Sequence, residues 1–206
     1  MPRIDDVRRG DRITTILDAA ERCFVRSGFH GATMAAICAE AGMSPGNLYR
    51  YFPSKEAMIE GLCERDFAEA AEGFAALEAT DDTWAAFRAL AAFHLIDEPR
   101  ESFAMWIEIM AEAARNPQIA ALRVKADLFI EEKLREALDM AHGRGHIAPQ
   151  ADIERGVQFM ITFSEGLMLR RARDPDFDPV PHVDMLFDIL RSLLLTPLAA
   201  SNDNLT

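Results

Sequence analysis

Residues 33–58, TMAAICAEAGMSPGNLYRYFPSKEAM, decide the fold of this chain. The segment reads as two short helices joined by a tight turn that starts at Gly42, which is the helix-turn-helix pattern. Thr33 is placed to cap the first helix and Ser44 to cap the second. Pro45 then takes the first helical position, where its missing N–H costs nothing. The second helix is too short to be stable in isolation, so packing against its neighbours must hold it.

The outward side of that second helix carries residue types that suit nucleic acid. Arg50 and Asn47 are types that read the edges of guanine and adenine. Tyr49, Ser44 and Lys55 suit phosphate oxygens. Gly46 costs about 1 kcal/mol relative to alanine in a helix, but it permits close approach to a groove. The alternative from the bare pattern is a plain helical hairpin within an all-α protein.

Apolar residues recur at helical spacing along the rest of the chain. The pattern predicts a helix over residues 12–27 that stops at Gly28, and a long helix that Ser54 caps. Further helices are predicted near 82–97, 100–115, 118–142, 152–172 and 180–195. No stretch shows the strict alternation of a half-buried strand, so the predicted fold class is all-α.

The charge of the chain is unevenly distributed. The formal net charge is −12, yet residues 1–60 hold eight basic and eight acidic side chains, so the remainder carries the whole excess. A polyanion would be repelled by the second part and tolerated by the first. The three cysteines form no paired spacing and are typical of a reduced cytosolic protein. We find no secretory signal and no apolar stretch of the roughly 18 residues that a membrane span needs.

Residues 12–60 resemble the tetracycline-repressor (TetR) family of bacterial transcriptional regulators. The stretch ILDAAERCFVRSGFHGATMAAICAEAGMSPGNLYRYFPSKEAMI is similar to that family's first helix and recognition segment at many fixed positions. The resemblance implies an N-terminal three-helix head that binds DNA over residues 1–60, with its motif at about 33–52. It also implies a helical ligand-binding and dimerisation body over residues 61–206.

Carried over by position, the resemblance assigns roles within the head. It implies that Thr33 and Lys55 touch phosphates. It implies that the residues facing the major groove are Ser44, Pro45, Gly46, Asn47, Tyr49, Arg50 and Tyr51. Pro45 departs from the family pattern, which often has Lys or Arg there.

The body shows a looser similarity to choline-, drug- and lipid-responsive members of the family, in WIEIMAEAARNPQIAAL and FSEGLMLRRARDPDFDP. The last two predicted helices have more apolar surface than one partner would cover, and the family implies a four-helix interface between two copies. The predicted contacts are Val157, Ile161, Val183, Leu186, Phe187, Leu190 and Leu194. The alternative is that these side chains form the core of a single chain.

The family also implies a pocket within the body. Its candidate lining is His94, Trp106, Met110, Phe129, Phe159 and Phe163, each of which also reads as ordinary core. Glu108 and Glu112, four apart, either meet a cationic ligand or lie on a solvated face. An aromatic-lined site suits a cation with apolar substituents, and a neutral lipid-like ligand would need only the apolar lining.

These observations together predict a cytoplasmic, homodimeric repressor that binds a pseudo-palindromic double-stranded DNA operator and is released by a small-molecule effector. The competing interpretation is a small-molecule-binding or interaction protein whose head no longer binds DNA. We expect no enzyme, because the five histidines are scattered and no nucleophile–base pair emerges from spacing. We likewise expect no metal, no cofactor and no membrane partner.

Overall fold

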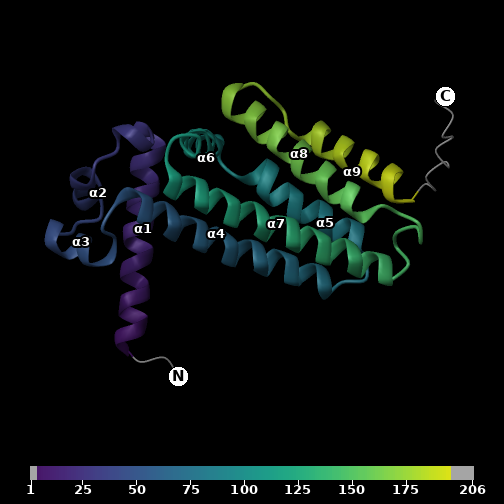
Figure 1. Cartoon of the computed structure of the whole chain (residues 1–206), viewed down its shortest axis with the longest axis horizontal. Coiled ribbons are helices and arrows are strands. Elements are labelled where there is room, and N and C mark those ends of the chain that lie inside the picture. The colour runs from purple at the N-terminus through teal and green to yellow at the C-terminus, as the bar shows by residue number, and fades with distance from the viewer. Residues whose placement is uncertain (1–3, 196–206) are drawn as a thin grey trace. The chain divides into compact units, whose positions relative to one another are not determined.

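The computed structural model describes the backbone of residues 4–195 and the side chains of residues 9–77 and 79–195. Every regular element in this range is a helix, as Figure 1 shows. The predicted all-α fold class is therefore confirmed.

The first three helices form the predicted helix-turn-helix arrangement. They are α1 (Ile4–Gly31), α2 (Met34–Glu40) and α3 (Pro45–Tyr51). Thr33 caps α2, because its hydroxyl accepts a hydrogen bond from the backbone N–H of Ala36 at 3.1 Å. Ser44 occupies the cap position of α3 in an extended conformation, but its side chain makes no capping hydrogen bond. The predicted stop at Gly28 is a break inside α1, where φ is 70° and ψ is 167°.

The remaining helices lie close to their predicted ranges. They are α4 (Lys55–Glu78), α5 (Thr83–Ala92), α6 (Arg100–Glu112), α7 (Pro117–Gly143), α8 (Ile153–Arg173) and α9 (Val180–Leu195). Ser54 caps α4 through its hydroxyl, which accepts from the N–H of Ala57 at 3.2 Å. The predicted helix at 82–97 differs in one respect: after α5 the chain continues as a π-helical segment, η1 (Phe93–Asp97). No helix in the described part of the chain is both long and apolar enough to cross a membrane.

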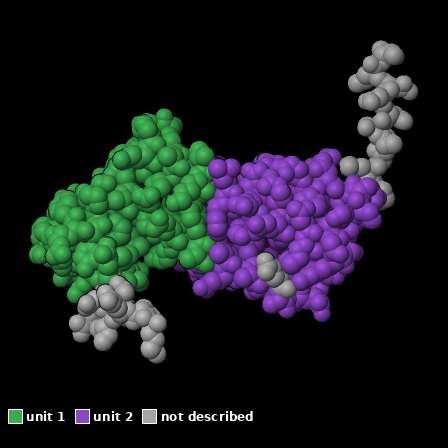
Figure 2. All heavy atoms as spheres, turned by 60° about the horizontal axis from the view of Figure 1, so that its bottom comes forward, with its two compact units in different colours: residues 1–68, 101–126 green, residues 69–100, 127–206 purple. Residues whose placement is uncertain are grey.

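The chain divides into two compact units, which Figure 2 colours separately. The first contains residues 1–68 and 101–126, and the second contains residues 69–100 and 127–206. The first unit therefore holds the predicted head together with most of α6 and the start of α7. Its core contains Phe24, Ile37 and Leu48 from the head, and Met105 and Ile109 from α6. The predicted boundary at residue 60 remains a prediction of where the DNA-binding function ends.

The second unit is built on the contacts of α9 with α8 and α5 and on residues of α7. Its buried residues include Val157, Val183, Leu186, Phe187, Leu190 and Leu194, and Ile161 packs against them. The six buried residues were predicted to contact a second copy, but within the single chain none of them is more than 5 % exposed. They form the core of this unit, in agreement with the alternative interpretation. These six side chains are therefore covered within the single chain, and the predicted dimer interface on α8 and α9 stays a prediction.

Candidate nucleic-acid interface

The helix α3 presents its polar side to solvent and its apolar side to the head core. Leu48 is fully buried, whereas Tyr49 is 50 % exposed and Arg50 is exposed as well. Ser44, Pro45 and Gly46 are also exposed, Asn47 is half-buried, and Tyr51 packs partly against the core. The structure thus brings the predicted groove-facing residues together on one short helix. That helix is held by Leu48, which shares a core with Ile37 of α2.

Two hydroxyl groups flank this helix pair. The hydroxyl of Thr33 accepts a hydrogen bond within α2, so its own proton is left to donate to a phosphate oxygen. The hydroxyl of Ser44 is exposed and is not used in capping. Both hydroxyl groups are exposed and have hydrogen-bonding capacity left, and their contact with phosphate stays a prediction.

Lys55 has a second role that its sequence position does not reveal. Its ammonium group donates to the carbonyl oxygen of Phe29 and, at 2.9 Å, to that of Ala32. It also lies 4.5 Å from the centre of the Phe29 ring. These carbonyls belong to the end of α1 and the turn before α2, so Lys55 ties the start of α4 to that turn. Two of its three N–H donors are occupied, which leaves one for the predicted phosphate contact.

Two carboxylates of α6 bind the same end of α1. The carboxylate of Glu108 accepts the backbone N–H of Phe29 at 2.9 Å. The carboxylate of Glu112, whose side chain is 9 % exposed, lies 2.8 Å from His30 Nε2 and accepts from Arg115 Nε at 2.6 Å. The sequence suggested a cationic ligand or a solvated face for these two residues. The structure shows instead that they link α6 to the segment that leads into the helix-turn-helix.

The charge of Glu112 is stabilised by these partners. Burial raises the pKa of its carboxyl, but the hydrogen bonds from Arg115 and His30 outweigh burial, so the pKa lies below its usual value. The carboxylate form is therefore the one that the folded protein favours.

Gly28 makes the close approach of α6 possible. A Cβ at this position would lie 2.7 Å from an oxygen of Glu108, closer than real contacts allow. The backbone conformation at Gly28 is also one that only glycine adopts readily. The glycine that the sequence marks as a helix stop is thus also the point where α1 and α6 meet.

The six predicted ligand contacts are divided between the two units. Trp106 and Met110 belong to the first unit, where Trp106 packs against the head core. His94, Phe129, Phe159 and Phe163 belong to the second. In neither described unit, then, do all six side chains meet.

Within the second unit, the structure supports part of this set. The rings of Phe159 and Phe163 lie 5.5 Å apart and pack against the core. Burial lowers the pKa of His94, and the nearby charges of Glu69 and Glu98 oppose that effect. The neutral form of His94 is accordingly favoured at neutral pH.

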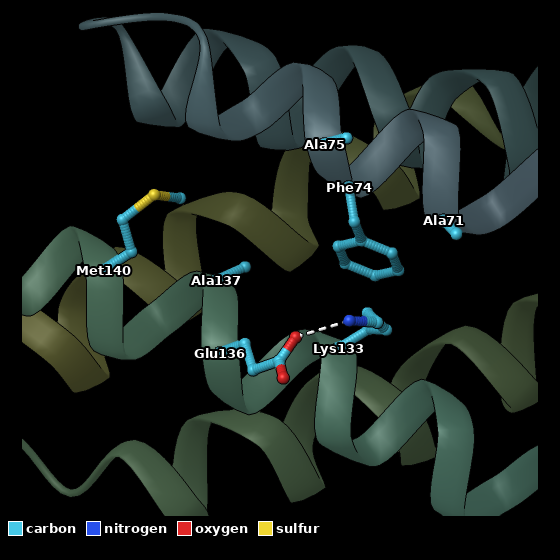
Figure 3. Close-up of a pocket in the computed structure, with 7 residues that line it drawn as sticks. All are labelled: Ala71, Phe74, Ala75, Lys133, Glu136, Ala137 and Met140. Carbon is cyan, nitrogen blue, oxygen red and sulfur yellow. Dashed lines mark hydrogen bonds and ion pairs between the residues drawn. The ribbon is translucent and has the colours of Figure 1, made fainter.

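A small pocket of about 100 Å³ lies between α4 and α7 in the second unit (Figure 3). Its lining is Ala71, Phe74, Ala75, Lys133, Glu136, Ala137 and Met140. The Lys133 ammonium and a Glu136 carboxylate oxygen form an ion pair at 2.6 Å along one side. None of the predicted ligand contacts lines this pocket. Among the described residues, no three His, Cys, Asp or Glu side chains are grouped so as to hold a metal ion.

Both the N-terminal and the C-terminal part of the chain match known protein families. Residues 16–62 match the family described as bacterial regulatory proteins of the tetR family. Residues 86–195 match the C-terminal region of BetI-type transcriptional repressors. The chain is 32 % identical over 166 residues to the HTH-type transcriptional regulator UidR of Escherichia coli strain K12, covering 75 % of this chain and 79 % of UidR.

More distant relatives and solved structures agree with these matches. The HTH-type transcriptional repressor AcnR of Corynebacterium jeikeium strain K411 is 26 % identical over 173 residues, covering 84 % of this chain and 88 % of AcnR. The structure of Salmonella enterica GusR superimposes with a TM-score of 0.75 at 30 % identity, covering 89 % of this chain and 95 % of GusR. A transcription regulator from Haloarcula marismortui shares the fold, with a TM-score of 0.74 at 16 % identity, over 90 % of this chain and 97 % of that one.

Proposed function

Because the chain belongs to the TetR family of transcriptional regulators, we propose that it binds a pseudo-palindromic operator as a homodimer and leaves it when a small molecule binds. Regulation of transcription is the function of the named relatives, UidR and AcnR among them. A regulator of this kind works in the cytoplasm, where bacterial DNA is accessible to it.

DNA recognition is assigned to α3. The observation that supports this assignment is the exposed and unpaired side chain of Arg50. This side chain is exposed on a helix held by its buried neighbours, and the described structure gives it no hydrogen bond or ion pair. An arginine free of carboxylate partners is ready to donate two hydrogen bonds to a guanine edge. Two copies of α3 enter successive major grooves, about 34–36 Å apart.

The homodimer is assigned to the exposed face of α8 and α9. Thr162, Gly166 and Leu169 are exposed at spacings of four and three residues on α8. Met185 and Ile189, four apart on α9, are 42 % and 37 % exposed. A Cβ on Gly166 would meet nothing within 4 Å, so another helix has room to approach closely there. This face has a small residue, Gly166, with exposed apolar side chains around it. Such a face suits packing against a second copy of the same helix pair.

The effector is assigned to the second unit and the response to α6. This helix begins at Arg100 and ends at Glu112, and through Glu108 and Glu112 it binds the end of α1. A ligand that favours another position of α6 would shift the turn before α2. That shift would change the orientation of the helix-turn-helix. The coupling required is on the order of 1–3 kcal/mol, as in other linked systems.

The competing function is a ligand-binding protein whose head no longer binds DNA, and the net charge of −12 favours it. Filter binding to random-sequence duplex at low salt separates the two. We expect the wild-type protein to retain duplex and to enrich one sequence class after several rounds of selection. A protein that retains no duplex at low salt would support the competing function.

A further inference from the structure

The helix α1 begins several residues before its first described contact with the head core. It starts at Ile4, but the first of its described side chains to pack against the head core is Ile13, and the first fully buried one is Ile16. At 1.5 Å per residue, the turns before Ile13 measure about 13 Å. Residues 9–12 are all exposed, and a Cβ on Gly10 would meet nothing within 4 Å. Figure 1 shows these first turns projecting beyond α2 and α3. Core packing therefore does not account for residues 9–12 of α1.

Several described arginines of the first unit already have a carboxylate partner. Arg22 and Arg26 bind Glu40, with nitrogen–oxygen distances of 2.8 and 3.3 Å. Arg65 binds acidic residues of α1. Arg115 binds Glu112. A cation with a carboxylate partner must give up that partner before it binds a phosphate, so these arginines are poor candidates for DNA contacts.

Three described arginines of this unit differ from the rest. The side chains of Arg9, Arg12 and Arg50 take part in no hydrogen bond, ion pair or ring contact of the described structure. Arg50 lies on α3, where the proposed function uses it. Arg9 and Arg12 lie three residues apart on the exposed first turns of α1 and so on neighbouring positions of one helix face. Asp11, also exposed, is turned about 100° away from Arg12 around the helix.

We propose that Arg9 and Arg12 form a second DNA contact, which binds backbone phosphates outside the base pairs that α3 reads. The guanidinium group matches phosphate oxygens with two parallel hydrogen bonds. Since α1 continues as one helix from these turns into the head core up to the break at Gly28, the two side chains are held at a fixed offset from the core. Phosphate contacts carry no sequence information, so this contact adds affinity and salt dependence but no selectivity. The proposal rests on the proposed DNA-binding function.

The test compares two double variants with equal changes in charge. The first combines Arg9→Gln and Arg12→Gln, and the control combines Lys125→Gln and Arg191→Gln. Lys125 and Arg191 are exposed and lie on α7 and α9. The probes are a 30-base-pair duplex that the wild-type protein selects from a random pool, and the same duplex trimmed to the segment that α3 protects. Affinity is measured by fluorescence anisotropy over a series of salt concentrations.

On the long duplex, we expect the α1 variant to show a salt slope lower by about 0.9 for each phosphate that an arginine no longer neutralises, and so by up to about 1.8 per protomer. Its ratio of affinities for selected and random duplex should equal that of the wild type. On the trimmed duplex, the α1 variant and the wild type should bind alike.

An unchanged slope on the long duplex, or an equal fall in the control variant, would overturn the α1 contact while the DNA-binding function stands. Wild-type protein that binds no duplex would overturn both. Both variants change exposed side chains, and an unaltered urea midpoint verifies that each remains folded.

Discussion

Lys55 acts on the protein's own backbone as well as on its predicted phosphate. Its two hydrogen bonds to the carbonyls of Phe29 and Ala32 join α4 to the end of α1. Lys55→Ala should therefore lower the free energy of unfolding by about 1–3 kcal/mol, as expected for charge-assisted hydrogen bonds in a half-buried place. Urea denaturation followed by circular dichroism measures this effect. The matched control is Lys125→Ala, because Lys125 pairs only at 4.0 Å with exposed Glu64 and should cost less than about 1 kcal/mol. Equal effects in the two variants would contradict the role of Lys55 as a tie.

Gly28 is the second residue on which the junction depends. Gly28→Ala forces a side chain into a conformation that costs about 1–3 kcal/mol, and it places a Cβ against Glu108. The variant should be destabilised by at least that much in the same assay. Gly31→Ala is the control, because the nearest atom to its added Cβ is 3.5 Å away, and we expect a change of less than about 1 kcal/mol. A Gly28→Ala protein as stable as the wild type would show that the backbone there is not fixed.

Among the elements, α6 makes the junction sensitive to acid. The pKa of Glu112 is lowered in the folded protein, so its contribution to stability is present above the unfolded value of about 4.5 and is lost as the pH falls through the folded pKa. The free energy of unfolding of Glu112→Gln should therefore fall less steeply than that of the wild type between about pH 5 and pH 3. Glu101→Gln, which changes an exposed residue of the same helix, should retain the wild-type dependence. Parallel curves for Glu112→Gln and the wild type would contradict the ion pair.

The helices α8 and α9 carry both buried core residues and exposed apolar residues, and the proposed interface uses the exposed ones. Met185→Glu with Ile189→Glu places charges on the exposed face, and it should yield folded monomers with weakened duplex binding, because a charge buried in an apolar interface is costly. Light scattering after size-exclusion chromatography measures the mass, and circular dichroism measures the helical content. Leu186→Glu with Leu190→Glu is the contrasting variant, since both side chains are at most 1 % exposed and the second unit should unfold. An intact dimer of the Met185 and Ile189 variant would place the interface elsewhere.

The helices themselves were largely predictable, and the reasons are local. Caps at Thr33 and Ser54 and the prolines that bound several helices act over a few residues, so their effect can be read from the sequence. The π-helical segment η1 was not predictable in this way, because its spacing is indistinguishable from that of α5 in an apolar pattern. Arg171 donates to the carbonyls of Leu95 and Ile96 from 75 or more residues away along the chain. A contact of that range leaves no trace in the periodicity of either segment.

At the scale of the whole molecule, the charge is divided between the neutral residues 1–60 and the acidic remainder, whereas the two compact units divide the chain in another way. Residues 101–126 share a compact unit with the head, so Trp106 and Met110 belong to a different unit from Phe159 and Phe163. The amphipathic face of α6 is visible in the sequence, yet its pattern does not say which core that face enters. The same limit explains why residues predicted to lie at a dimer interface are buried within the single chain. An apolar stripe has the same sequence pattern whether it packs within one chain or between two.

Reading of a pseudo-palindromic duplex by two copies of α3 through Arg50 is the step on which the proposed function depends. Hydroxyl-radical footprinting on the duplex selected by the wild-type protein examines it without assuming an operator. We predict two symmetric protected segments, centred about one helical turn of DNA or a multiple of it apart. Arg50→Ala should weaken specific binding by about 1–3 kcal/mol and relax selectivity at one base pair of each half-site. A single unsymmetric footprint, or a selected duplex that Arg50→Ala binds with unchanged affinity and selectivity, would refute this mode of binding.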